Sequence, residues 1–125
     1  MRKILVVDDE VSICSLVKFA LEKEGHYKVI ISSEGKNALL SAEREKPDLI
    51  LLDIAMPGMD GLEVLKRLKD NARTVEIPVV MFTARSDEAS KETAARLYDE
   101  EYITKPFEME DLKTRIEEVL HRRGR

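Results

Sequence analysis

Residues 49–53 read Leu-Ile-Leu-Leu-Asp, four large aliphatic side chains followed directly by an aspartate. A continuous aliphatic run of this length is typical of a strand that is buried on both faces within a parallel sheet. An aspartate that follows such a strand is poorly explained by packing, because charged side chains are almost never buried without a partner. The stretch therefore predicts a central strand with a functional carboxylate, Asp53, at its carboxyl end.

Four further aliphatic runs predict the remaining strands, at residues 4–7, 29–31, 79–82 and, more weakly, 102–103. Between the runs, apolar residues recur at helical spacing. These residues are Ile13, Val17, Ala20 and Leu21; Ala38, Leu39 and Ala42; Leu62, Leu65 and Leu68; Ala89, Thr93, Ala94 and Leu97; and Leu112, Ile116, Val119 and Leu120. Gly25 is expected to end the first helix and Ser33 to cap the second. Strand and helix alternate five times, which predicts an α/β fold with a doubly wound, five-stranded parallel sheet covered by helices on both faces.

Composition predicts one soluble domain spanning residues 1–125. Hydrophobic residues make up 43% and charged residues 37% of the chain, a balance typical of globular proteins. The formal net charge of −4 argues against nucleic acid as a partner. The single cysteine, Cys14, excludes an internal disulfide and is expected in the core. No apolar run is long enough for a signal peptide or a membrane span, so a cytoplasmic protein without a membrane partner is expected.

Polar side chains gather at the predicted carboxyl ends of the strands, where a doubly wound sheet binds its ligand. They are Asp8, Asp9 and Glu10 after the first strand, Asp53 after the third, Thr83 after the fourth, and Lys105 and Pro106 after the fifth. Strand ends that meet water explain one or two acids. Three neighbouring aspartates, however, repel one another and require a cation.

Mg²⁺ fits this requirement, because it prefers oxygen ligands in octahedral geometry and retains bound waters. Asp9 and Asp53 are expected to supply carboxylate oxygens directly, and Asp8 through a water molecule. The backbone carbonyl of Ala55 is expected to supply a further ligand. Mn²⁺, which accepts the same oxygen ligands, is expected to substitute for Mg²⁺.

The same residues predict phosphoryl transfer to Asp53. A carboxylate nucleophile forms an aspartyl phosphate, and negative charge spreads over the phosphoryl oxygens during transfer. Lys105 and Thr83 are expected to neutralise or hydrogen-bond those oxygens. Pro106 allows a cis peptide bond after Lys105, which would direct the lysine over the site.

These motifs resemble the receiver domains of bacterial two-component response regulators, including the chemotaxis regulator. The resemblance runs from Lys3 to about Leu120. It is carried by Val-Asp-Asp-Glu at 7–10, Pro-Asp-Leu-Ile-Leu-Leu-Asp at 47–53, Met-Pro-Gly-Met-Asp-Gly at 56–61, Thr-Ala at 83–84 and Lys-Pro-Phe at 105–107. It implies a flavodoxin-like sheet of order 2-1-3-4-5, with Gly61 and Pro106 in structural roles.

The resemblance also implies a phosphorelay function. The donor would be a sensor histidine kinase or a histidine phosphotransfer protein, and the domain would be a signalling protein that assists its own phosphorylation and dephosphorylation rather than an enzyme. Thr83 and Tyr102 would switch the surface of the fourth helix, fifth strand and fifth helix toward a downstream protein. The domain would be a monomer or a phosphorylation-dependent dimer. Whether it stands alone or belongs to a longer regulator stays open.

The chain departs from the family pattern at Tyr98 and Asp99, where Gly-Ala is usual. Tyrosine disfavours the positive φ that glycine allows at a helix end, and acids are unfavourable at that pole of the helix. The segment from about Asp87 to Glu101 is therefore expected to be the least stable part of the fold.

Two other classes of protein carry functional acids or bind phosphate groups at the ends of such strands. Phosphatases of the haloacid dehalogenase type carry Asp-x-Asp on the first strand, whereas here Asp8 and Asp9 are adjacent and the candidate nucleophile follows the third strand. A nucleotide-binding domain would carry a glycine-rich phosphate loop after the first strand, which this chain lacks. Release of phosphate from small phosphomonoesters would distinguish the phosphatase from the receiver.

Overall fold

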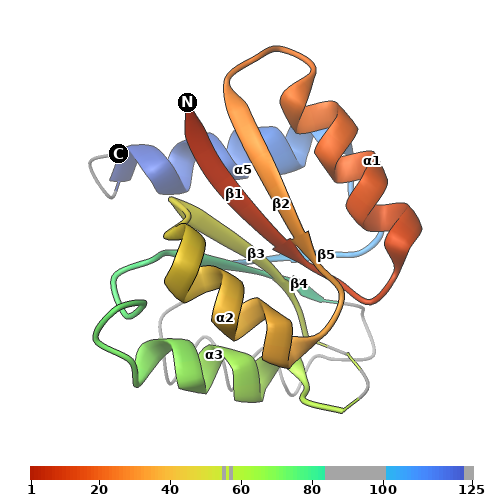
Figure 1. Cartoon of the computed structure of the whole chain (residues 1–125). Coiled ribbons are helices and arrows are strands. Elements are labelled where there is room, and N and C mark those ends of the chain that lie inside the picture. Colours follow the sequence, from red (N-terminus) through yellow and green to blue (C-terminus); the bar gives the residue numbers. More distant parts are fainter. Residues whose placement is uncertain (55, 57, 84–100, 123–125) are drawn as a thin grey trace.

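Strands and helices alternate along the chain in the computed structural model, which describes residues 1–54, 56, 58–83 and 101–122 (Figure 1). The elements are β1 (Arg2–Val7), α1 (Val11–Glu22), β2 (Tyr27–Ser32), α2 (Gly35–Glu45), β3 (Leu49–Asp53), α3 (Gly61–Lys69), β4 (Val79–Thr83), β5 (Glu101–Thr104) and α5 (Met109–Arg122). The helix expected around residues 89–97, with Tyr98 and Asp99, falls outside the described residues. Among the helices that are described, none is both long and apolar enough to span a membrane.

All five strands form one parallel sheet in the order β2-β1-β3-β4-β5, which confirms the expected topology. β3 lies at the centre, and every one of its residues is buried. The register pairs Val7 with Leu52 and Asp53 with Phe82. The ends of β1, β3 and β4 therefore meet at one edge of the sheet.

Helices cover both faces of the sheet, with α1 and α5 on one side and α2 and α3 on the other (Figure 1). Successive residues of β3 alternate between the two cores, as side chains of a strand must. Leu49 and Leu51 belong to the core that includes α1 and α5, whereas Ile50 and Leu52 belong to the core that includes α2 and α3. This arrangement explains why the strand reads as a continuous aliphatic run.

Of the two helix boundaries that the sequence predicted, the end of α1 is confirmed and the start of α2 is not. α1 ends at Glu22, and Gly25 adopts a φ of +80°, as expected of a residue that ends a helix. Ser33 was the predicted cap of α2, but this prediction is wrong: the helix begins one residue later, with Glu34 at the cap position. The first residue of the helix, the buried Gly35, lies so near α3 that a Cβ there would be 2.8 Å from Val64.

The inward face of α1 is turned slightly from the predicted stripe. Val17 and Leu21 are buried as expected, but the third buried residue is Cys14. Ile13 and Ala20 are only half-buried. The stripe predicted for α5, in contrast, is buried at all four positions.

Charged side chains form hydrogen bonds with backbone groups of both edge strands, β2 and β5. In α1, the Lys18 ammonium donates to the Val29 carbonyl of β2, and Glu22 accepts from the Val29 amide, at 2.9 and 2.8 Å. At the other edge, Arg115 of α5 donates to the Tyr102 carbonyl of β5 at 3.0 Å. The helices thus satisfy polar groups that edge strands otherwise expose.

Candidate functional site

Three aspartates meet at the carboxyl edge of the sheet. Asp8 follows β1, Asp9 begins the connection to α1, and Asp53 ends β3. One carboxylate oxygen from each lies within 4.8 Å of the others. Asp8 and Asp53 are buried, whereas Asp9 is exposed. A set of hard oxygen donors, one of them open to solvent, fits a Mg²⁺ ion that retains part of its hydration.

Hydrogen bonds hold the amide, the carbonyl and the carboxylate of Asp8. Its amide donates to the Ser32 carbonyl of β2 at 3.2 Å, and its Oδ1 accepts from the Glu10 amide at 2.9 Å. The Cys14 thiol lies 3.3 Å from the Asp8 carbonyl and donates to it. Because both the backbone and the carboxylate are fixed, Asp8 provides a rigid side to the acidic cluster.

Among the residues that the structure describes, Lys105 supplies a cation to this cluster. Its Nζ donates to Asp8 Oδ2 at 2.9 Å and lies 3.6 Å from Asp53 Oδ2 and 3.7 Å from Glu10 Oε1. Burial alone lowers the pKa of Lys105, but the hydrogen bond to Asp8 and the charges of Asp53, Asp8 and Glu10 together outweigh it, so the net pKa shift is upward. Among the described residues, one lysine stands against four acids, so this part of the cluster carries an excess of negative charge.

Gly61, the first residue of α3, lies against the backbone of Asp53. Its amide donates to the Ile54 carbonyl at 2.7 Å, and a Cβ at this position would lie 2.3 Å from the Asp53 carbonyl oxygen. Asp60 caps the same helix by accepting from the Glu63 amide at 2.9 Å. Only glycine permits this close approach, which fixes the position of the Asp53 backbone at the end of β3.

The structure describes the other predicted site residues to different extents. The Lys105–Pro106 peptide bond, which the sequence allowed to be cis, is cis. Tyr102 is half-buried and packs against the core that includes α2 and α3. Thr83 ends β4 beside the site, but its side chain is not among those described, and Ala55 lies outside the described residues altogether.

Sequence reasoning assigned no role to two aromatic residues beside the cluster. The rings of Phe82 and Phe107 stack at a centroid distance of 5.1 Å and an interplanar angle of 12°. Lys105 Nζ lies 5.7 Å from the centroid of the Phe82 ring. The only available signal was the Lys-Pro-Phe motif, because the stack joins a residue of β4 to a residue of the loop that follows β5.

Cys14 is a core residue, as expected. It is 1% exposed, and burial, followed by the charge of Asp8, raises the pKa of its thiol to about 11. Because the thiolate is the reactive form, a thiol with this pKa remains inert near neutral pH.

An apolar groove of about 640 Å³ adjoins the acidic cluster. It runs between α1 and the loop that follows β5, and Glu10 and Lys105 belong to both the groove and the cluster. Leu16 and Phe19 of α1 line it and are 60% and 70% exposed. Large exposed apolar side chains grouped in this way are typical of protein-binding surfaces.

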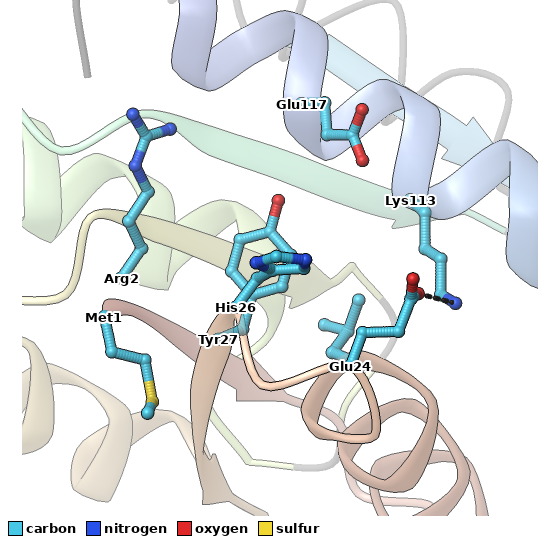
Figure 2. A pocket seen from close by; sticks show the side chains of 8 residues that line it. Met1, Arg2, Glu24, His26, Tyr27, Lys113 and Glu117 are labelled. Carbon is cyan, nitrogen blue, oxygen red and sulfur yellow. Dashed lines mark hydrogen bonds and ion pairs between the residues drawn. The ribbon is translucent and has the colours of Figure 1, made fainter.

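A second pocket, of about 480 Å³, lies at the amino end of the sheet (Figure 2). Its lining includes Arg2 at the start of β1, Glu24 and Tyr27 near the start of β2, and Lys113 and Glu117 of α5. An ion pair of 3.0 Å joins Lys113 to Glu24 (Figure 2). None of the predicted site residues whose side chains the structure describes lines this pocket.

Comparisons with known proteins agree over nearly the whole chain. Residues 4–117 match the family described as the response regulator receiver domain. The alkaline phosphatase synthesis transcriptional regulatory protein PhoP of Bacillus subtilis (strain 168) is 44% identical over 121 residues, which are 97% of this chain and 49% of PhoP. The chain therefore spans about half the length of this relative.

Solved structures give the same result. The chemotaxis protein CheY4 of Vibrio cholerae superposes with a TM-score of 0.87 at 30% identity, over 95% of this chain and 98% of that one. The receiver domain of NtrX from Brucella abortus superposes with a TM-score of 0.85 at 35% identity, over 94% of this chain and 98% of that one.

Proposed function

Because the chain belongs to the response regulator receiver domain family, we propose that it accepts a phosphoryl group on Asp53 in a Mg²⁺-dependent reaction. Receiver domains are signalling domains of two-component systems. The observation that carries the proposal is the position of Asp53, which ends the most buried strand within 4.8 Å of the Asp8 and Asp9 oxygens and 3.6 Å from the Lys105 ammonium.

The proposed reaction is a displacement at phosphorus. A carboxylate oxygen of Asp53 attacks the phosphorus atom, the P–N bond of a donor phosphohistidine breaks, and the freed imidazole nitrogen takes up a proton from solvent. Asp9 and Asp53, with Asp8 through water and the Ala55 carbonyl, would hold Mg²⁺, which neutralises charge on the phosphoryl oxygens when bound. Mn²⁺ would substitute for it.

Lys105 and Thr83 would contact the remaining phosphoryl oxygens. In the resting state the Lys105 ammonium is nearer to Asp8 than to Asp53, at 2.9 against 3.6 Å, and the incoming phosphoryl group would offer it a new partner. Thr83 follows Phe82, whose register partner is Asp53. With Tyr102, Thr83 would then alter the surface that includes β5 and α5.

The test is phosphorylation by a small phosphodonor such as acetyl phosphate, measured by intact-mass spectrometry. Wild-type protein with Mg²⁺ should gain one phosphoryl group, and Asp53→Asn should gain none. Asp48→Asn is the matched control, because Asp48 precedes the same strand at the opposite edge of the sheet. A mass gain in Asp53→Asn equal to that of the wild type would place the nucleophile elsewhere.

We further propose that the donor is a protein, a sensor histidine kinase or histidine phosphotransfer protein, that docks on the groove beside α1. Phe19→Ser should slow transfer from such a donor by roughly tenfold or more, because central apolar anchors dominate binding energy. Transfer from acetyl phosphate should not change. Leu40→Ser, at a residue of α2 that is 56% exposed, is the matched control. Equal slowing with both donors would argue against docking at this groove.

The downstream partner is proposed to be a protein that binds the face containing β5 and α5. PhoP is described as a transcriptional regulator, so a DNA-binding output elsewhere in a longer chain is compatible with the match. This domain itself is proposed to bind neither nucleic acid nor membrane. It would be a monomer or a phosphorylation-dependent dimer, which ultracentrifugation with and without a phosphoryl mimic would distinguish.

A further inference from the structure

The Phe82–Phe107 ring stack lies between the core and the loop that carries Lys105. Phe82 is fully buried in β4, next to Asp53 in register. Its ring centroid lies 5.1 Å from that of Phe107 and 5.7 Å from the Lys105 Nζ. One buried ring therefore contacts both the loop and the charged group that the loop delivers.

The loop needs such an attachment because the sheet no longer supports it. Pairing between β4 and β5 ends at Thr104, and α5 begins only at Met109. Lys105 lies in the gap, on a flexible four-carbon side chain whose ammonium must reach Asp8 and Asp53 together. Phe107 packs against the core that includes α1 and α5 and joins the middle of this loop to it.

We propose that Phe107 is a positioning residue for Lys105: its stack on Phe82 sets the loop so that the ammonium lies between Asp8 and Asp53. The proposal builds on the proposed phosphoryl transfer, but it makes a prediction about the resting protein as well. Loss of the stack displaces the ammonium, and its longer contacts, with Asp53 at 3.6 Å and Glu10 at 3.7 Å, are lost before the hydrogen bond to Asp8.

The first test uses the metal-free, unphosphorylated protein and therefore does not depend on phosphoryl transfer. The Lys105 side-chain amine resonance is followed by NMR with labelled lysine. Phe107→Leu, which keeps apolar volume but removes the ring, should move this resonance toward that of a solvent-exposed lysine. Phe107→Tyr, which keeps the ring, should restore the wild-type resonance. An unchanged resonance in Phe107→Leu would overturn the proposal.

The control for general packing loss is Tyr27→Leu. Tyr27 is also a half-buried aromatic residue of the same core, but it lies at the amino end of the sheet. The Tyr27→Leu substitution should leave the Lys105 resonance unchanged. If Phe107→Leu fails to fold, as judged by circular dichroism, Phe107→Met provides the same comparison with a more adaptable side chain.

The second test is a double-mutant cycle on the rate of phosphorylation by acetyl phosphate. Phe107→Leu should slow the reaction roughly tenfold, because small misplacements of a reacting group have effects of this order or larger. In a Lys105→Met background it should have no further effect, since no ammonium remains to be misplaced. Equal slowing in both backgrounds would mean that Phe107 acts only through packing and would overturn the proposal.

The two tests separate this proposal from the one that it builds on. If wild-type Asp53 is not phosphorylated while Phe107→Leu still moves the Lys105 resonance, the proposed function fails and the positioning role stands.

Discussion

The two ends of the sheet each hold a lysine–carboxylate pair, but their surroundings differ. Lys105 lies 2.9 Å from Asp8 at the carboxyl end, and Lys113 lies 3.0 Å from Glu24 at the amino end. The Asp8 side chain is fully buried, whereas that of Glu24 is 56% exposed. Nearly equal distances therefore describe two different kinds of interaction, because water screens one pair and not the other.

The balance of charge differs as well. At the amino end, Glu24 and Glu117 face Arg2 and Lys113 in one pocket, so acids and bases are matched. At the carboxyl end, Asp8, Asp53 and Glu10 lie around Lys105 and Asp9 lies beside the other two aspartates, so acids outnumber bases among the described residues there. A surplus of fixed carboxylates attracts a divalent cation, and the matched pocket offers no such attraction.

Removal of each lysine should produce the largest difference between the two ends. Lys105→Met should lower the free energy of unfolding of the metal-free protein by about 3 kcal/mol, because it leaves buried carboxylates without their cation. Lys113→Met should leave it unchanged within experimental error. Urea unfolding in the presence of a chelator measures both variants.

Mg²⁺ sharpens the same experiment. Saturating Mg²⁺ should recover part of the stability that Lys105→Met loses, since the ion supplies positive charge to the same carboxylates and binds only the folded state. It should not affect the difference between wild type and Lys113→Met. Equal losses in the two variants would mean that burial does not distinguish the pairs. No recovery of Lys105→Met by Mg²⁺ would mean that the ion does not bind these carboxylates.

Two glycines give a smaller contrast. Gly61→Ala should destabilise the fold by about 2–3 kcal/mol, because the added Cβ would meet the Asp53 carbonyl oxygen at 2.3 Å. Gly25→Ala, at the amino end, meets no atom within 4 Å but must adopt a φ of +80°, which costs about 1 kcal/mol. Thermal unfolding compares the two.

The kinetic consequence should separate the glycines more clearly. Gly61→Ala should also slow phosphorylation of Asp53, whereas Gly25→Ala should not. If Gly25→Ala slows the reaction as much, the two ends of the sheet are more closely coupled than their geometry indicates.

The smallest expected effect concerns acid pH. The Val29 amide, followed by the Lys18 ammonium, lowers the pKa of Glu22. A carboxylate with a lowered pKa stabilises the fold above its unfolded pKa of about 4.3, and this contribution is lost as pH falls through the folded pKa. Glu22→Gln should thus be less stable than wild type at neutral pH, with the difference shrinking below about pH 4.3.

Stability measured between pH 7 and pH 3 tests this prediction. Glu76→Gln, at an exposed residue between α3 and β4, is the control. A difference between wild type and Glu22→Gln that stays constant across this range would contradict the assigned cause.

Local pattern was sufficient to predict the strands, the parallel sheet and the acids at its edge. The continuous aliphatic run at residues 49–52 marks a strand buried on both faces and places Asp53 at its end, and parallel strands bring such ends together. The start of α2 was not predictable in this way. A serine at position 33 is a favourable cap in isolation, but the cap position falls at Glu34, and the helix begins at Gly35, where a Cβ would meet Val64 and Met59.

The supports of the site were also beyond sequence reasoning. The Cys14 thiol of α1 donates to the carbonyl of Asp8, which follows β1, and Phe107 of the loop after β5 stacks on Phe82 of β4. Neither contact has a periodic signature, because each depends on the distance between elements after packing. Asp8, Asp53 and Lys105 were predicted together because their chemistry identifies them, whereas ordinary core side chains that fix them carry no chemical signal.

The side chains that α1 extends to β2 affect how copies of the protein meet. A foreign strand that approached this edge would need the Val29 amide and carbonyl, which Glu22 and Lys18 already occupy. To pair there, it would have to strip both charged groups from their partners and leave them beside a new backbone. The middle of this edge is therefore protected against intermolecular β-pairing, and pairing through Val29 should begin only after the α1 side chains have been displaced.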